Sequence, residues 1–148
     1  MGVVRMTERH IAHDPPQAGE LEALRAQVAE VLREGVPEDV RRSVTGAVAV
    51  AGTATSTAAI DLELDPYDPD KVHGHVLTTA QLDDELAMLA AMPNGERRDV
   101  PGLHPDRAPT IVAGVCLLLE VLDAFGLSRV EVSEHDILRG AALRRATD

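Results

Sequence analysis

The stretch that decides the fold is Ala47-Val48-Ala49-Val50-Ala51-Gly52-Thr53-Ala54-Thr55-Ser56, a short apolar run that stops at a glycine and several hydroxyls. A continuous run of small and β-branched apolar residues predicts a strand buried on both faces. Gly52 allows a sharp turn, and threonine and serine are residues that cap helices. The stretch therefore predicts a strand, a tight turn and the start of a helix.

This order of elements favours binding of an anion, phosphate above all, at the turn. The first N–H groups of a helix have no partner within it, and the helix dipole is positive at that end. The candidate phosphate-binding residues are Gly52, Thr53, Ala54 and Thr55. The stretch lacks the length and the lysine of a P-loop, so capping of the helix by the hydroxyls is the competing interpretation.

Composition limits what can surround this turn. With 148 residues and 45% hydrophobic residues, the chain is long and apolar enough for one domain with its own core. The formal charge of −11 argues against nucleic acid and anionic membranes as partners. Tyr67 and Phe125 are the only aromatic residues, which makes an aromatic platform for bases or sugars improbable.

The single cysteine and the length of the apolar runs argue against two further classes, disulfide-bonded and membrane-spanning proteins. Cys116 is the only cysteine, so no internal disulfide forms, and its apolar neighbours predict a buried, inert thiol. The longest apolar run extends from Ile111 to Leu119, which is far short of the roughly 20 residues of a membrane span. We expect a cytoplasmic protein.

Periodicity and capping residues predict the other elements. Ser133 is expected to cap a last helix with Ile137, Leu138 and Leu143 facing inward. The helix from Pro109 to Phe125 is apolar nearly all round, which predicts burial on several sides over the strands. The expected elements are a strand at Gly2–Met6, helices at Gln17–Glu34 (entered at Asp14), from Thr78 and at Pro109–Phe125, and a strand at Arg129–Ser133; the expected core residues are Ile111, Val115, Leu118, Leu119 and Leu122.

Two stretches contain residues that could form a metal site, and a third contains several cationic side chains. The acidic segment 61–70 lacks the EF-hand spacing, and His73 and His75 have no third ligand nearby, so we expect a solvated loop and ordinary polar residues. Segment 96–108 carries Arg97, Arg98 and Arg107. These arginines either pair with the neighbouring Glu96, Asp99 and Asp106 or assist an anion site.

Five collinear motifs together resemble the Ppx/GppA phosphatase family. They are Arg5-Met6-Thr7-Glu8; Val48 to Thr55; Tyr67-Asp68 with Val72-His73-Gly74; Glu96-Arg97 with Gly102 to Ala108 and Ile111 to Gly114; and Val132-Ser133-Glu134 with Leu138-Arg139-Gly140. The resemblance covers nearly the whole chain.

The resemblance implies an actin-like (ribonuclease H-like) α/β fold, with a few-stranded sheet covered by helices. It also implies a phosphoanhydride hydrolase that acts on polyphosphate or guanosine pentaphosphate and uses a divalent cation, usually Mg²⁺. Residues 1–148 resemble only the second of the family's two domains and lack its start. The family's Gly-rich phosphate loops and catalytic Glu do not occur here, so we assign neither a catalytic residue nor a metal ligand.

The resemblance favours the Gly52–Thr55 loop as a phosphate site, with Arg97 and Arg107 as possible electrostatic help. Three hypotheses follow: an enzyme fragment that is inactive alone, half of a split enzyme that needs a separate N-terminal domain, or a non-catalytic module that binds phosphate or nucleotide. In each case we expect a free strand edge or apolar patch near the N-terminus, which would recruit an N-terminal domain or a second copy.

Overall fold

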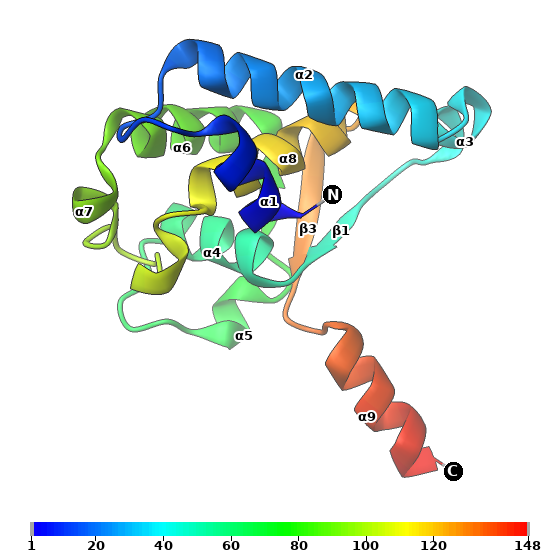
Figure 1. Ribbon diagram of the computed structural model, residues 1–148. Coiled ribbons are helices and arrows are strands. Elements are labelled where there is room, and N and C mark those ends of the chain that lie inside the picture. Colours follow the sequence, from blue (N-terminus) through cyan, green and yellow to red (C-terminus); the bar gives the residue numbers. More distant parts are fainter. Residues whose placement is uncertain (1, 148) are drawn as a thin grey trace.

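The computed structural model describes residues 2–147 and shows a mixed α/β chain (Figure 1). Its elements in chain order are α1 (Val3–His10), α2 (Ala18–Gly35), α3 (Glu38–Ser43), β1 (Val48–Val50), α4 (Gly52–Asp61), α5 (Pro69–Val72), β2 (Val76–Thr78), α6 (Thr79–Ala91), α7 (Asn94–Arg97), the 3₁₀ helix η1 (Pro105–Arg107), α8 (Ile111–Ala124), β3 (Arg129–Ser133) and α9 (Ile137–Thr147). The expected fold class, a small sheet covered by helices, is confirmed.

The sheet has three strands in the order β1-β3-β2. β1 runs parallel to β3, with Val50 opposite Ser133, and β2 runs antiparallel to β3. β1 is therefore an edge strand, and Val48 and Val50 are 62% and 47% exposed. The expected burial of this strand on both faces is wrong, because the face that carries Val48 and Val50 is exposed and Ala49, on the other face, is only half-buried.

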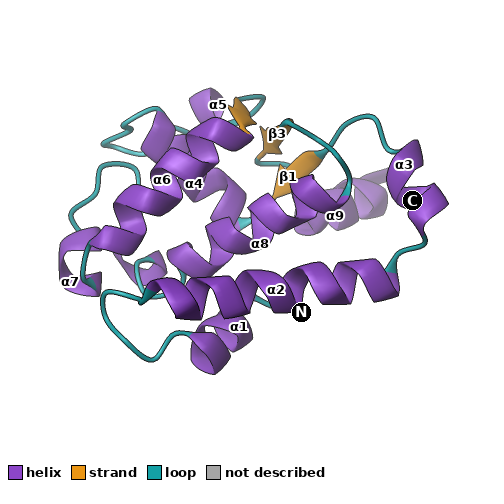
Figure 2. Cartoon of the chain, turned by 90° about the horizontal axis from the view of Figure 1, so that it is seen from above, coloured by secondary structure: helices purple, strands orange, loops and turns teal. Residues whose placement is uncertain are grey.

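Helix α8 lies at the centre of the molecule (Figure 2). Its principal neighbours are the helices α1, α2, α4 and α6 rather than the strands. Four of the five expected core residues on α8 are buried, whereas Leu118 is only half-buried. Cys116 is fully buried, as expected, and burial raises the pKa of its thiol to about 11.

The N-terminal segment is helical, and its predicted strand at Gly2–Met6 is wrong. Helix α1 packs on α2 and α8 and buries Met6, and this tertiary packing outweighs the preference of Val3 and Val4 for strands. The free strand edge expected near the N-terminus is therefore not formed by these residues, and the edge strands of the described sheet are β1 and β2. Helix α2 is confirmed, but Gln17 caps it in a reciprocal capping box with Glu20, and Asp14 does not.

The start of α6 and the end of α8 agree with the capping signals in the sequence. Thr78 and Gln81 form the expected capping box of α6, and Gly126 follows α8 with a φ of 64°. The three-residue strand β2 was not expected, because only its pairing with β3 reveals it.

Helix α9 extends away from the body of the molecule (Figure 1). Ile137 is 84% exposed, and Leu138 and Leu143 are also exposed, so their expected inward position is wrong. Asp136, not Ser133, caps this helix by accepting from the N–H groups of Leu138 and Arg139. Of the helices in residues 2–147, none is long and apolar enough to cross a membrane.

Candidate functional site

The turn between β1 and α4 begins with an unusual backbone conformation. Ala51 has a φ of 71° and a ψ of 178°, a region that residues with a side chain rarely adopt. The chain then enters α4 at Gly52, and the N–H of Thr55 donates to the carbonyl of Ala51. The strained residue of the turn is thus Ala51, although Gly52 was expected to supply the sharp bend.

The N-terminus of α4 has no side-chain cap. Thr53 instead points toward α8, because a Cβ added at Gly114 would lie 2.7 Å from the Thr53 hydroxyl oxygen. Ala54 is buried, while Thr55 is only half-buried. The competing interpretation, in which hydroxyls cap this helix, is therefore not observed. The first N–H groups of α4 therefore have no capping side chain among the described residues.

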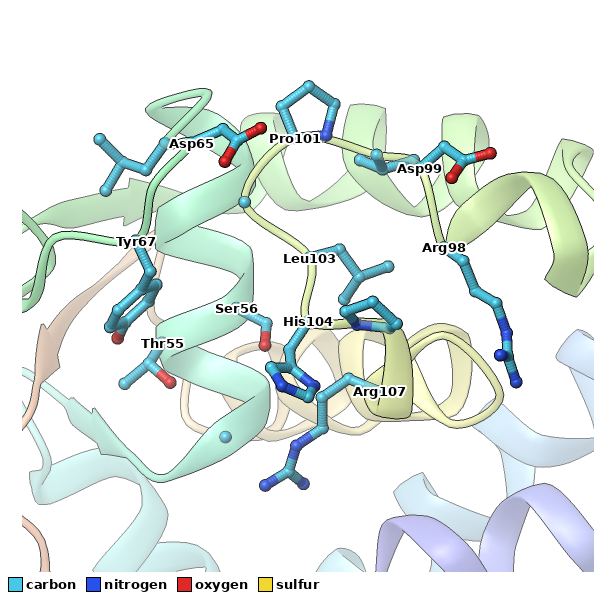
Figure 3. Close-up of a pocket in the computed structure, with 15 residues that line it drawn as sticks. Thr55, Ser56, Asp65, Tyr67, Arg98, Asp99, Pro101, Leu103, His104 and Arg107 are labelled. Carbon is cyan, nitrogen blue, oxygen red and sulfur yellow. The ribbon is translucent and has the colours of Figure 1, made fainter.

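A cavity of about 700 Å³ lies beside this helix end (Figure 3). Three segments form it: the first turn of α4, the loop that precedes α5, and residues 98–107. Its polar side chains include Thr55, Ser56, Tyr67 and Arg107. In Figure 3 the guanidinium group of Arg107 lies at one edge of the cavity, and the carboxylates of Asp65 and Asp99 lie at the other edge.

Arg107 lies directly against the start of α4. A Cβ added at Gly52 would lie 2.5 Å from Cζ of Arg107 and 2.6 and 2.9 Å from its two Nη atoms. Gly52 is therefore the residue that lets the guanidinium group approach the backbone of the helix end. An exposed cation, N–H groups and a helix dipole meet at one point, and this combination is suited to an anion such as phosphate.

Tyr67 forms the wall of the cavity beside Thr55 (Figure 3). Its hydroxyl donates to a carboxylate oxygen of Glu134, which follows β3. Partial burial and the bond to Glu134 raise the pKa of Tyr67 to about 12, although a hydrogen bond with the Thr55 side chain opposes this shift. The pocket thus holds a neutral hydroxyl in contact with Thr55.

Arg97, the other predicted cation, lies outside the cavity. Its side chain is only 4% exposed and donates to the carbonyls of Leu89 and Ala108 and to Asp14. Arg98, its neighbour, does line the cavity. The expected ion pairs between these arginines and Glu96, Asp99 or Asp106 do not occur among the described residues, where Arg97 pairs with Asp14.

The stretches that suggested a metal hold other interactions. His75 forms a hydrogen bond of 2.7 Å with Asp61, and His73 stacks on His135 with the ring centroids 4.0 Å apart. Within residues 2–147, no group of three or more His, Cys, Asp or Glu side chains could hold a metal ion.

The comparisons with known proteins agree with one another. The model of the Ppx/GppA phosphatase family matches residues 1–145. The chain belongs to the Ppx/GppA phosphatase family. It is 33% identical to exopolyphosphatase 2 of Mycobacterium tuberculosis over 99% of this chain and 47% of that protein. It is 32% identical to a bifunctional 3-dehydroquinate synthase/phosphatase of Fusobacterium nucleatum, over 97% of this chain and 21% of that protein.

A solved Ppx/GppA phosphatase of Aquifex aeolicus superposes with a TM-score of 0.86 at 31% identity. The alignment covers 96% of this chain and 46% of that structure. This Ppx/GppA chain therefore spans about half the length of the exopolyphosphatase and of the solved structure that it matches.

The sequence named some of the residues that line this cavity and missed others. It placed Gly52, Thr55 and Arg107 at the site, and the structure brings these three residues together. It gave no site role to Tyr67 and Glu134, which are 67 residues apart. The one available signal was that both residues belong to the collinear motifs.

Proposed function

We propose that this chain supplies a phosphate-contacting wall of a phosphoanhydride hydrolase. The substrate of that enzyme is inorganic polyphosphate, from which it releases the terminal phosphate, or guanosine pentaphosphate, which it converts to the tetraphosphate. Membership of the family supports this proposal, as does the name exopolyphosphatase of the mycobacterial relative. The observation that carries it is the contact between the Arg107 guanidinium and Gly52 at the uncapped end of α4.

The geometry suggests what these residues do for a phosphoryl group. The N–H groups of Gly52, Thr53 and Ala54 and the Thr55 hydroxyl donate to its oxygens. The Arg107 guanidinium balances the charge that develops on them as the bond to the leaving group breaks. In this scheme a water attacks phosphorus, and a glutamate outside residues 1–148 accepts its proton.

Magnesium stays a prediction from the resemblance. We derive no step of the reaction through the metal. The cytoplasmic location and the reading of residues 1–148 as the second domain also stay predictions. In the split-enzyme alternative, the free edge of β1 with exposed Val48 and Val50 receives a separately encoded domain or a second copy.

Two measurements test the proposal. The first is calorimetric titration of the chain with inorganic tripolyphosphate. We expect Arg107→Ala to weaken binding about tenfold, since a charge-assisted contact is lost. Arg129→Ala removes the same charge at the opposite end of β3 and should leave the affinity within about twofold. Equal affinities of the wild type and Arg107→Ala would remove the proposed site.

The second measurement separates the enzymatic hypotheses. We expect the isolated chain with Mg²⁺ to release no phosphate from polyphosphate, because positioning and water activation need groups that it lacks. Turnover near that of a full-length relative would overturn this expectation. Tight binding of guanosine tetraphosphate without any activity, even after addition of a catalytic half, would favour the non-catalytic module.

A further inference from the structure

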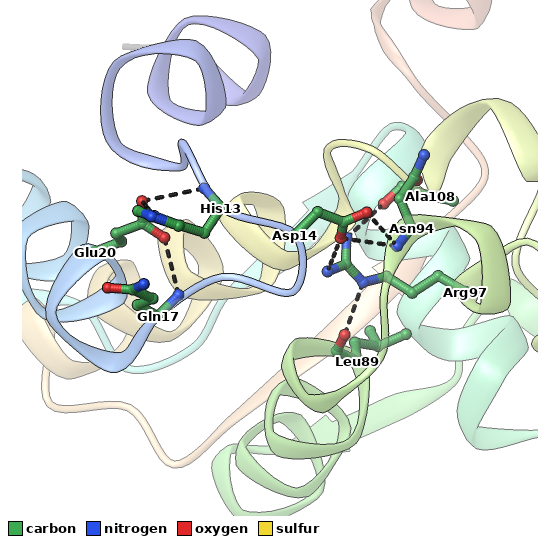
Figure 4. A network of polar contacts seen from close by, with 8 residues as sticks. All are labelled: His13, Asp14, Gln17, Glu20, Leu89, Asn94, Arg97 and Ala108. Atoms are coloured by element: carbon green, nitrogen blue, oxygen red, sulfur yellow. Dashed lines mark hydrogen bonds and ion pairs between the residues drawn. The ribbon is translucent and has the colours of Figure 1, made fainter.

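The side chain of Arg97 joins three separate parts of the chain (Figure 4). Its Nε donates to the carbonyl of Leu89 in the last turn of α6 at 2.7 Å. Nη1 donates to the carbonyl of Ala108 at 3.4 Å, and Nη2 donates to Oδ1 of Asp14 at 3.3 Å. The planar guanidinium group is suited to this task because its donors point in fixed, divergent directions.

The burial of this cation needs a reason. Arg97 is 4% exposed, and taking a cation out of water costs free energy unless its donors are bonded. Asp14, its only acidic partner in the described residues, is half exposed and also accepts from the N–H of Asn94. An apolar side chain could fill the same space but could not hold the carbonyls of Leu89 and Ala108.

What Arg97 holds in place is the end of η1. Ala108 directly follows Arg107, the last residue of η1. The N–H of Arg107 donates to the carbonyl of His104 at 2.8 Å, and the carbonyl of Arg107 accepts from the N–H of Thr110 at 2.9 Å. The bond from Arg97 to Ala108 spans eleven residues, and together with the bond from Arg97 to Leu89 it links the end of η1 to α6.

We infer that Arg97 is a positioning residue, which holds the exposed Arg107 guanidinium over Gly52 without contacting the ligand itself. The inference rests on the proposed function, because it concerns the same phosphate site. It assigns different roles to the two arginines of one loop: Arg97 supplies buried hydrogen bonds, and Arg107 supplies charge at the ligand. The nearest atoms to a Cβ at Gly52 are all from Arg107, which shows how closely that side chain is placed.

A double-mutant cycle with inorganic tripolyphosphate tests this role. Arg97→Lys keeps the charge but cannot bond both carbonyls and Asp14 with the same geometry. We expect it to weaken binding five- to tenfold in the wild-type background and less than twofold in the Arg107→Ala background. A residue that only stabilises the fold would lower the melting temperature in both backgrounds without this difference in affinity.

The outcomes are distinguishable. If the wild type binds tripolyphosphate and Arg97→Lys weakens binding equally in both backgrounds, or in neither, the positioning role is refuted. If the wild type itself does not bind, the proposed function fails instead.

If Arg97→Lys does not fold, a second measurement on the wild-type protein tests the inference. It is NMR relaxation of the arginine Nε–Hε groups, which reports how mobile each side chain is. We expect the Arg107 side chain to be more restricted than that of exposed Arg129. Equal mobility would refute the inference.

Discussion

Glu85 on α6 gives the sharpest prediction about stability. Its side chain is 7% exposed, and neither carboxylate oxygen has a hydrogen-bond partner among the described residues. Burial, and secondarily the charge of Asp61, raise the pKa of Glu85 from 4.5 to about 8. Asp61 in turn accepts a hydrogen bond from the side-chain amide of Gln81 at 2.9 Å and shares one of 2.7 Å with His75.

The size of the effect follows from linkage. Below pH 4.5 Glu85 is protonated in both the folded and the unfolded protein, so it adds no pH dependence. Between pH 4.5 and about 8 only the unfolded protein releases the proton, and each pH unit removes about 1.4 kcal/mol of stability. The full penalty is on the order of 4 to 5 kcal/mol above pH 8, and about 3 kcal/mol at pH 7.

The assay is urea unfolding of the wild type and Glu85→Gln at several values between pH 5 and pH 9. The neutral amide keeps the shape of the protonated acid, so the variant should gain stability over the wild type as the pH rises. Glu22→Gln, at an exposed position of α2, controls for the substitution itself. The reasoning is refuted if the free energies of unfolding of Glu85→Gln and the wild type differ by the same amount at every pH.

Three further predictions concern the turn and the core. Ala51→Gly relieves the positive φ and should raise the free energy of unfolding by about 1 kcal/mol in a denaturation series. Gly52→Ala should displace the flexible Arg107 side chain, so that tripolyphosphate affinity falls while the melting temperature changes little; unchanged affinity would contradict the site. Leu122→Ala should cost about 2–5 kcal/mol, and Leu118→Ala clearly less because that residue is half-buried; equal losses would contradict the burial pattern.

The long helices were predictable because their apolar residues recur with helical period and their ends carry strong signals. The capping box at Thr78 and the glycine at 126 show this directly. The short elements were not predictable. α1 has β-branched residues but is held as a helix by packing on α2 and α8, and the three residues of β2 become a strand only through β3.

The site was predictable only in its local part. The turn at Gly52 follows from adjacent residues, whereas the approach of Arg107 joins positions 55 residues apart and depends on the path of η1. The charge pattern of the sequence does not predict that the neighbouring residues Arg97 and Arg98 differ in burial and in role. One becomes a buried donor to backbone carbonyls, and the other stays at the rim of the cavity.

The aliphatic core also determines how this protein can be observed. The chain has no tryptophan, and its one tyrosine, Tyr67, lies in the wall of the cavity beside Thr55 and Glu134. Intrinsic ultraviolet fluorescence is therefore a local reporter. A carboxylate that accepts a hydrogen bond from the phenol quenches the fluorescence of tyrosine. Any ligand that separates Tyr67 from Glu134 should therefore increase the fluorescence of the protein, and the core does not contribute to this signal.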